Sequence, residues 1–456
     1  MPGTVLLGAA PSEAARLGAE LGLWTLLPFA ALLLCIAFLP LATPHFWERN
    51  RNKGLLAGLC ALPVALYLPL AHGSAGAHVL LEKAEEYTSF ILLLGALFVI
   101  TGGMHLRGSL QASAGVNTAF MGVGAVLANL VGTTGASMLL IRPLLRINAG
   151  RSATHVVVFF IFTVSNCGGL LTPLGDPPLF LGFLKGVPFE WTLRLWKPWL
   201  VAVGALLACF YLVDRRRYGL GMAPPADGPR HPLRLEGAHN GIFLLAIVGV
   251  IYAAGSGVGN GGAPWPFGWQ EGAMALLAAL AFFTTSGRHR VSNQFAFAPI
   301  VEVAVLFAGI FVTMAPALLV LNAWGQGARE VAGFGFGVSE PWQYFWTTGL
   351  LSSFLDNAPT YLTFAATASG AAGVPADGRY LALFLEGGAE ASRVLAAIAC
   401  GAVFMGANTY IGNGPNFMVK AIAEHRGVRM PSFFRYMAAA GLFLVPLWIL
   451  LTLLFF

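Results

Sequence analysis

The sequence predicts an all-α polytopic membrane protein built from two inverted repeats. Each repeat is expected to hold five crossing helices and one re-entrant hairpin, with helices broken near the membrane midplane. The chain of 456 residues is 57% hydrophobic and only 10% charged, with a mean hydropathy of +0.74, whereas soluble domains carry about 25% charged residues. Apolar runs of about 20 residues, long enough to cross a bilayer as a helix, recur along nearly the whole chain. This composition excludes a water-soluble globule.

The first repeat is expected at 21–213, after an N-terminal segment at 1–20. Its uninterrupted apolar runs are expected to cross the membrane near 21–41, 54–72, 88–106 and 194–213. The segment 116–147 carries the polar, Gly-rich break NLVGTTG. It is too short for two crossings, which need about 40 apolar residues, so a re-entrant hairpin is predicted. The segment 153–185 contains the break SNCGGLLTPLGDPP and is predicted to be one crossing made of two half-helices.

The second repeat is expected at 239–456 and repeats this order. A polar cytoplasmic linker at 214–238 precedes it, and the charges and prolines of the linker place it on the surface. A second hairpin is predicted at 341–369, broken by SSFLDNAPT, and a second broken helix at 391–424, broken by GANTYIGNGPN. The remaining apolar runs are expected to cross near 239–257, 270–287, 297–321 and 433–456.

The two repeats also match residue by residue. The stretch GGLLTPLGDPPLF at 168–180 aligns with MGANTYIGNGPNF at 405–417, and a weaker alignment pairs LANLVGTT at 127–134 with LDNAPTYL at 355–362. Because each half has five crossings, an odd number, the second half starts from the opposite face of the membrane. Inverted repeats with broken helices are typical of secondary transporters, and the breaks mark the expected substrate site.

The distribution of positive charge sets the expected orientation. Most of the 26 Lys and Arg residues fall in the segments 42–53, 107–152, 214–238, 288–290 and 420–435. This side is expected to be cytoplasmic, which places both termini outside the cytoplasm, with the protein in the inner (plasma) membrane of a bacterium. The net charge of +6 then reflects topology. The lipid bilayer is the expected partner, and no nucleic acid is expected to bind.

Asp176, in the stretch TPLGDPP, is the first candidate for the site. A carboxylate inside a membrane span is costly and is by default functional. Such a group can hold a proton when the site is empty and release it when a cation arrives. The alternative is a structural carboxylate that caps the second half-helix, because Asp suits an N-cap and Pro177 and Pro178 suit the first turn. The aligned residue of the second repeat is Asn413, so the two equivalent positions hold one titratable group.

The other breaks supply further candidates. Asp356 is predicted to bind the same ion, to cap the return arm of its hairpin or to pair with a buried arginine. Na⁺ takes neutral oxygens together with a carboxylate, and such oxygens are offered by Asn129, Thr133, Thr134, Asn166, Asn357, Thr360, Asn408, Thr409 and Asn413. The alternatives for these side chains are turn geometry and hydrogen bonds between helices. Glu302 is a candidate proton-relay or gate residue, or a helix-end carboxylate that reaches toward the interface.

The four interrupted stretches resemble the ion transporter superfamily with its citrate-transporter-like domain. Within it they are similar to NhaD-type sodium/proton antiporters, arsenite permeases and P-protein-like permeases. The resemblance covers about 21–456, and GGLLTPLGDPP at 168–178 is its most specific stretch. It implies a scaffold domain, a transport domain with two opposed hairpins, elevator-like alternating access and often a homodimer. Leu179 stands where the P-protein group usually has Asn, and neither hairpin tip has the Ser-Asn-Thr of the dicarboxylate branch.

Two carboxylates near the predicted site oppose an anionic substrate, because like charges repel strongly in a low dielectric. We therefore expect a sodium/proton antiporter in which Na⁺ is bound by Asp176, Asp356 and neighbouring Asn and Thr residues, in competition with H⁺. Neither catalytic residues nor cofactors are expected. The alternatives are arsenite or antimonite efflux, which would use neutral or thiol ligands such as Cys167, and transport of a di- or tricarboxylate such as citrate. An intramembrane aspartyl protease is excluded because PLGD and LD do not match its GxGD and YD motifs.

Overall fold

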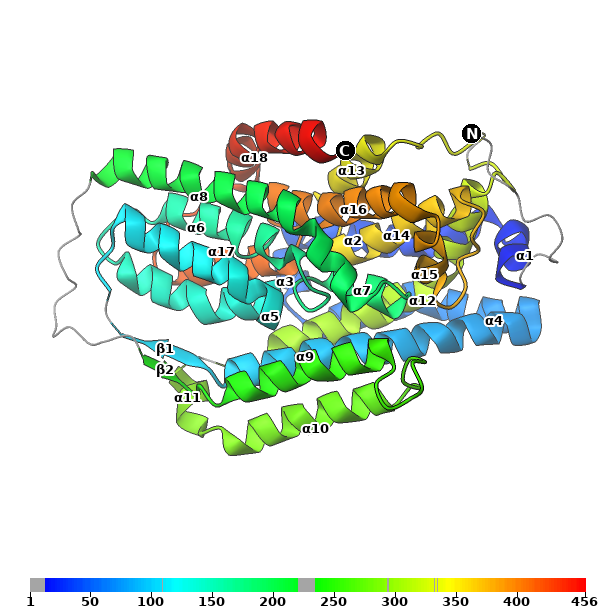
Figure 1. Ribbon diagram of the computed structural model, residues 1–456, viewed down its shortest axis with the longest axis horizontal. Coiled ribbons are helices and arrows are strands. Elements are labelled where there is room, and N and C mark those ends of the chain that lie inside the picture. The colour runs from blue at the N-terminus through cyan, green and yellow to red at the C-terminus, as the bar shows by residue number, and fades with distance from the viewer. Residues whose placement is uncertain (1–12, 109, 220–233, 293–294, 332, 334) are drawn as a thin grey trace.

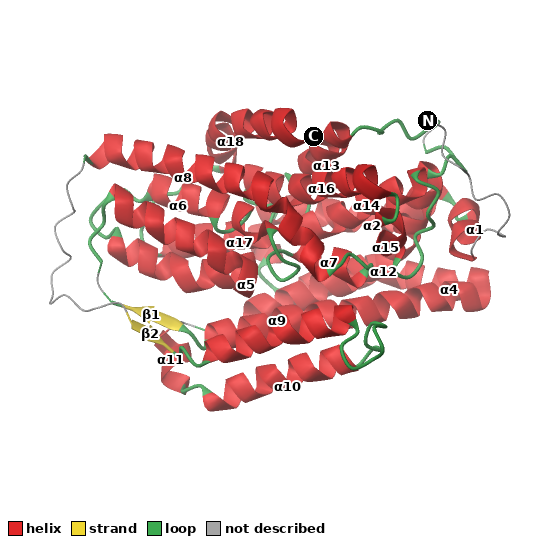
Figure 2. Ribbon diagram, viewed as in Figure 1, coloured by secondary structure: helices red, strands yellow, loops and turns green. Residues whose placement is uncertain are grey.

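The computed structural model describes residues 13–108, 110–219, 234–292, 295–331, 333 and 335–456. This part of the chain folds into eighteen α-helices and one two-stranded sheet (Figures 1 and 2). Seven of its helices are long and apolar enough to cross a membrane. Most of the longer helices run along one common axis (Figure 1). The predicted all-α polytopic fold is thereby confirmed.

The elements follow one another in two halves. The first half contains α1 (Glu13–Glu20), α2 (Leu27–Ala42), α3 (Pro44–Trp47), α4 (Asn50–Gly102), β1 (His105–Arg107), α5 (Ala114–Ile147), α6 (Thr154–Thr163), α7 (Pro177–Leu184) and α8 (Trp196–Tyr218). The second half contains β2 (Arg234–Glu236), α9 (Asn240–Ser256), α10 (Trp269–Thr284), α11 (Gly287–Ser292), α12 (Ala298–Gly325), α13 (Pro341–Ser352), α14 (Asn357–Ala371), α15 (Tyr380–Leu385), α16 (Gly388–Met405), α17 (Gly414–His425) and α18 (Phe433–Phe455). Short 3₁₀ turns at Cys167–Leu170 and Gly406–Asn408 interrupt the two broken helices.

Two of the longest helices turn back on themselves at a glycine. In α4 the reversal is at Gly73, with a φ of 56°, and it brings Gly76 against the backbone of Leu68. In α5 it is at Gly132, with a φ of 77°, and it brings Gly124 against the side chain of Leu140. A positive φ is a conformation that glycine adopts without steric cost, so these two residues form the turns of two helical hairpins.

Some boundaries differ from those expected. The helix α8 continues to Tyr218, so the start of the expected linker at 214–238 is helical, and three arginines in its last turn favour this because they complement the helix dipole. The linker ends in β2, which pairs antiparallel with β1. The expected span at 88–106 ends earlier than predicted, because α4 stops at Gly102 and β1 follows it. Polar strands of three residues leave no periodic signal. Residues 1–12 of the expected N-terminal segment and 220–233 of the linker lie outside the described residues.

The two broken helices share one local geometry. Asp176 precedes α7 with φ and ψ of −149° and 145°, and Asn413 precedes α17 with −152° and 139°. Each is followed by proline in the first helical turn. At both breaks the chain crosses itself at glycine: a Cβ on Gly175 would lie 2.1 Å from the carbonyl oxygen of Gly169, and one on Gly412 would lie 2.7 Å from that of Gly406. The backbone crossing therefore sets the position of Asp176.

We predict that Gly175→Ala destabilises the protein by about 1–3 kcal/mol, because the new methyl group would overlap the Gly169 backbone and force it to shift. The matched control is Gly115→Ala in α5, where an added Cβ meets nothing within 4 Å. This control is expected to be neutral or stabilising by up to about 1 kcal/mol. Thermal unfolding in detergent measures both changes, and equal unfolding midpoints for the two variants would contradict the account of the break.

Candidate functional site

The carboxylate of Asp176 is the centre of the candidate site. It is 1% exposed and sits at the N-terminal end of α7. Its Oδ1 accepts hydrogen bonds from Thr133 Oγ1 at 2.7 Å and from Asn413 Nδ2 at 3.5 Å. Its Oδ2 accepts one from the amide of Asn357. The hairpin and the broken helix of each half thus meet at one carboxylate. Thr133 comes from α5, Asn357 from the start of α14, and Asn413 precedes α17.

Hydrogen bonds to the backbone correct the predicted alignment of the two hairpins. Thr172 Oγ1 donates to the carbonyl of Asn129 at 2.5 Å, and the equivalent Thr409 Oγ1 donates to the carbonyl of Ser353 at 2.5 Å. Asn129 therefore corresponds to Ser353, and four residues later Thr133 corresponds to Asn357. The alignment of Asn129 with Asn357 is wrong by about one helical turn. It relied on a shared Leu and Asn, whereas in the corrected alignment Asn129 and Thr133 correspond to residues of another type.

A network of buried amides extends from the carboxylate. Asn413 Nδ2 also lies 3.2 Å from the carbonyl of Ser165 and 3.2 Å from Asn166 Oδ1. Asn166 in turn donates to the Ile161 carbonyl at 2.8 Å and to Asn416 Oδ1 at 2.7 Å. These contacts join the two broken helices to each other. Asn166 is therefore part of the support for Asn413, and it does not contact Asp176 itself.

The surroundings of Asp176 provide neutral donors and one unused acceptor. Among the described residues, no Lys, Arg or His side chain forms an ion pair or hydrogen bond with Asp176. Asn357 Oδ1 is buried and has no hydrogen-bond partner in the part of the chain that the structure describes. A buried acceptor without a donor is destabilising, and a cation that bound both this oxygen and the carboxylate would satisfy it. A mostly apolar cavity of about 70 Å³ lies next to this break; Thr133, Thr134 and Gly175 are among the residues that line it, whereas Asp176 is not, and it is large enough for water.

Asp356 takes up the N-cap position of α14. Its Oδ1 accepts a hydrogen bond from the backbone N–H of Ala358 at 3.1 Å, and its side chain is half-buried. Its charge acts on Asp176, but no hydrogen bond joins the two carboxylates in the described part of the chain. The capping alternative explains this contact, and the negative charge beside the site adds to its attraction for a cation.

Four of the sequence candidates form hydrogen bonds that brace the hairpins. Thr360 donates to the Asp356 carbonyl at 2.9 Å, and Asn129 donates to that of Ala125 at 3.0 Å. Asn408 donates to Ser353 Oγ at 2.8 Å. Thr409, besides its bond to the Ser353 carbonyl, accepts from the backbone N–H of Gly412 at 3.0 Å. The structure brings none of these four side chains to the Asp176 carboxylate, whereas Thr134 lines the neighbouring cavity.

Glu302 lies apart from this site, near the start of α12. Its Oε1 forms an ion pair of 2.6 Å with Nζ of Lys53 in α4, and its side chain is 40% exposed. A carboxylate with a paired lysine and access to solvent fits the helix-end alternative. The structure does not place Glu302 next to Asp176.

Sequence reasoning missed a buried cluster of four charges. Lys185, at the C-terminal end of α7, contacts Glu86 Oε1 at 2.5 Å and Glu82 Oε1 at 2.7 Å. Lys83 contacts both oxygens of Glu86, at 2.9 and 3.0 Å. The side chains of Lys185, Lys83 and Glu86 are each less than a tenth exposed. The cluster joins the end of α7, the helix that follows Asp176, to α4.

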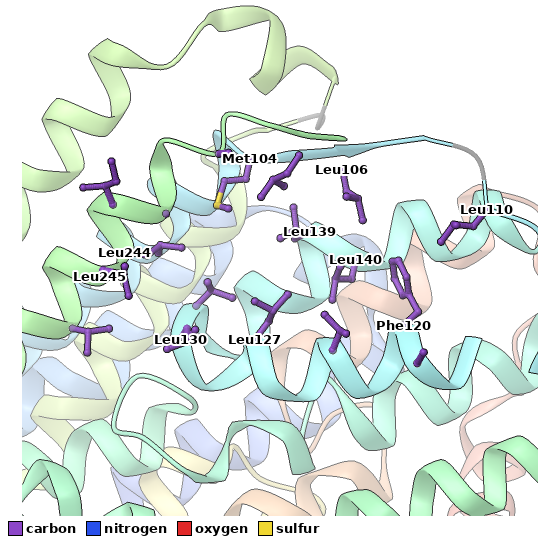
Figure 3. A pocket seen from close by; sticks show the side chains of 18 of the residues that line it. Met104, Leu106, Leu110, Phe120, Leu127, Leu130, Leu139, Leu140, Leu244 and Leu245 are labelled. Carbon is purple, nitrogen blue, oxygen red and sulfur yellow. The ribbon is translucent and has the colours of Figure 1, made fainter. Parts of the chain in front are cut away.

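A larger cavity of about 770 Å³ is a different kind of feature. It lies between α5 and α9, and its walls are apolar side chains that include Met104, Phe120 and Leu245 (Figure 3). None of the described residues that line it has a charged or amide side chain. In a membrane protein, a groove of this kind suits lipid chains or apolar packing, so it does not compete with Asp176 as an ion site.

Comparison with known proteins places the chain in a family. No curated protein matches the chain. A family model, CitMHS_2, described as "Putative citrate transport", matches residues 18–456. This match covers both hairpins, both broken helices and all the residues around Asp176. The chain therefore belongs to this family of citrate-transport type.

Proposed function

We propose that the protein is a sodium/proton antiporter in which Na⁺ and H⁺ compete for Asp176. The observation that carries this proposal is a buried carboxylate whose hydrogen-bond partners among the described residues are all neutral, with the buried Oδ1 of Asn357 beside it. An ionised carboxylate with no basic partner is costly to bury. Either a proton on the carboxylate or a bound cation removes this cost, and the two alternatives exclude each other.

The exchange cycle follows from that competition. With a proton bound, Asp176 is neutral, so no cation is required to offset its charge. When Na⁺ arrives, the carboxylate releases its proton and becomes a ligand together with Asn357 Oδ1, and Thr133 Oγ1 lies within the same shell. Both loaded forms are neutral at Asp176, so both can cross a low-dielectric region more easily than the empty, charged form. This difference couples the two ion fluxes.

The convergence of the two halves on one carboxylate supports alternating access. Parts of the chain from α5, α7, α14 and α17 meet at Asp176, whereas α4 and α12 pack along each other beside them. We propose that the first group moves in an elevator-like manner against the second, within a homodimer in the inner membrane of a bacterium and with both termini outside the cytoplasm. Superfamily resemblance and the position of the basic residues support this arrangement.

The test is transport by purified protein in liposomes that contain a pH-sensitive dye. A Na⁺ gradient is expected to move protons in the opposite direction, with no effect of an equal gradient of choline. A series of Na⁺, Li⁺ and K⁺ at several pH values gives the ion selectivity. Na⁺ gradients that leave the internal pH unchanged, at every pH tested, would refute the antiport proposal.

Transport of a carboxylate such as citrate is the second candidate, and the description of the family favours it. A free anion would face the charge of Asp176 with no basic side chain hydrogen-bonded to that carboxylate among the described residues. The substrate would therefore have to arrive with a cation. Uptake of labelled citrate into the same liposomes, measured with and without Na⁺ and divalent cations, separates this candidate from cation/proton antiport.

We predict that Thr133→Val weakens the binding of Na⁺ while leaving the fold intact. Valine keeps the size and shape of threonine but removes the hydroxyl that donates to Asp176 Oδ1. Loss of one hydrogen bond to a charged group corresponds to about a tenfold rise in the Na⁺ concentration for half-maximal exchange. Thr118→Val is the control: Thr118 lies in the same helix, its hydroxyl donates to the Ala114 carbonyl of that helix, and its loss should leave that concentration unchanged.

A further inference from the structure

A polar cavity of about 500 Å³ lies away from Asp176, at the end of the molecule where α8 ends and β1–β2 lies (left in Figure 1). One wall is the connection between α5 and α6, and the other is the connection between α17 and α18. Thr154 Oγ1 bridges the walls by donating to the Arg429 carbonyl at 2.9 Å. We call this space the arginine cavity, after the four arginines that line it, Arg146, Arg151, Arg426 and Arg429.

The described lining of the arginine cavity is positively charged. It contains four arginines and no Asp or Glu, and among the described residues only Arg151 has a carboxylate in ion-pair range from outside the lining, that of Asp214 at 3.9 Å. Arg426 is close enough to Arg146 for their charges to repel. Gathering like charges in one place is unfavourable unless an opposite charge is added. A bound anion would supply that charge.

Arg151 provides a second, independent indication of a ligand. Its side chain is only 7% exposed, and its guanidinium stacks on the ring of Tyr218 at 3.8 Å, which fixes its orientation. Its Nη1 is buried and makes no hydrogen bond with any described residue. It forms an ion pair with Oδ2 of Asp214 at 3.9 Å, which is too long for a hydrogen bond. A buried, oriented donor without an acceptor is the kind of group that a ligand oxygen satisfies.

The start of α6 adds backbone donors to the same space. Ala153 and Thr154 line the cavity, and α6 begins at Thr154 and continues for ten residues. Its N-cap position is Ala153, which offers no capping side chain. The N–H groups of the first helical turn have no partner within the helix and carry a partial positive charge, which favours phosphate.

We propose that the arginine cavity binds a phosphate group, carried either by the headgroup of an anionic lipid or by a soluble phosphate compound. Guanidinium groups match phosphate oxygens in bidentate geometry, and four of them together with a helix N-terminus suit a group with more than one negative charge. Basic pockets between membrane helices bind lipid headgroups by the same chemistry. A ligand here would join the return arm of α5 to the end of α17, and so would link the two halves. This inference is independent of the proposed transport function.

The experiment compares two double variants of the full-length protein. Arg426→Gln with Arg429→Gln removes two charges from the cavity. Arg216→Gln with Arg217→Gln removes two exposed charges from the end of α8, near the cavity but outside its lining. Thermal unfolding is followed in neutral detergent with increasing inorganic pyrophosphate, against chloride at equal ionic strength. A parallel arm uses nanodiscs of phosphatidylcholine with and without phosphatidylglycerol.

Pyrophosphate is expected to raise the unfolding midpoint of the wild type and of the control in a saturable manner. The cavity variant is expected to bind it about tenfold or more weakly, because two charge-assisted contacts are lost. If phosphatidylglycerol raises the unfolding midpoint of the wild type and the control but not of the cavity variant, and pyrophosphate raises none of them, the phosphate group is that of a lipid headgroup. Equal shifts for the two double variants in both arms, or no shift in either arm, would overturn the proposal.

Discussion

Asp176→Asn is expected to abolish ion exchange, reducing Na⁺-driven proton movement in liposomes to the level of empty vesicles. The amide keeps the size of the carboxylate and can still contact Thr133 and Asn413, but it can neither hold an exchangeable proton nor offer a negative charge to a cation. Asp176 is the carboxylate that accepts hydrogen bonds from both halves of the described chain, and Asp356 forms no hydrogen bond with Thr133, Asn357 or Asn413 there, so we do not expect Asp356 to replace it. The measurement is the pH change inside dye-loaded liposomes after a Na⁺ jump.

Asp377→Asn is the matched control, since Asp377 is an exposed aspartate between α14 and α15, away from this shell. It should exchange ions at the wild-type rate. Retention of exchange by Asp176→Asn would remove Asp176 from the transport mechanism and leave the capping alternative as its role. Loss of exchange in both variants would point to a general effect of the substitutions on folding or reconstitution.

Lys185→Met is expected to destabilise the protein by about 3–5 kcal/mol, the usual cost of breaking a buried ion pair from one side. The substitution keeps the length of the side chain but leaves Glu86 and Glu82 sharing Lys83 as their remaining partner within the cluster. The carboxylate of Glu86 is less than a tenth exposed, so water does not replace the lost lysine. Unfolding by heat or by denaturing detergent in micelles measures the loss.

The control for this prediction is Lys420→Met, which breaks the more exposed pair of Lys420 with Glu424. Such a pair contributes about 0.3–0.5 kcal/mol, so the unfolding midpoint should hardly move. Adding Glu82→Gln to Lys185→Met restores charge balance in the cluster and should recover part of the loss. A Lys185→Met protein as stable as Lys420→Met would show that the cluster does not hold α7 to α4.

The fold class and the position of Asp176 could be predicted because both follow from what a bilayer excludes. Polar, Gly- and Pro-rich breaks in apolar runs survive only where other parts of the protein satisfy the freed backbone groups. The matching breaks therefore had to lie together, and Thr133, Asn357 and Asn413 do lie against Asp176.

The individual role of each polar side chain could not be predicted from the sequence. Thr360 and Thr133 both follow a hairpin break. Thr360 donates to the backbone carbonyl of Asp356, whereas Thr133 donates to the carboxylate of Asp176. The choice depends on which face of the helix each side chain occupies after the turn. The one-turn error in aligning the hairpins has a similar origin. The backbone carbonyls of Ser353 and Asn129 accept equivalent hydrogen bonds from threonines, although the two side chains differ.

The sequence shows part of the buried charge cluster, the spacing of its residues in α4, but it does not show that they are buried. Glu82 and Glu86 are four residues apart, so they lie on one face of α4, and Lys83 is three residues before Glu86. That spacing predicts a local ion pair on a helix surface. The burial of the group depends on Lys185, which is about a hundred residues away in sequence, so only the packing of α7 against α4 reveals it.

The most direct test of the central claim, that Na⁺ and H⁺ compete for Asp176, is proton release on Na⁺ binding. Purified protein is held in a weakly buffered detergent solution with a pH indicator, and NaCl is added against a choline chloride blank. We expect Na⁺ to release protons from the wild type and from Asp377→Asn in a saturable manner, and to release none from Asp176→Asn. No release from the wild type, or equal release from Asp176→Asn, would contradict this claim.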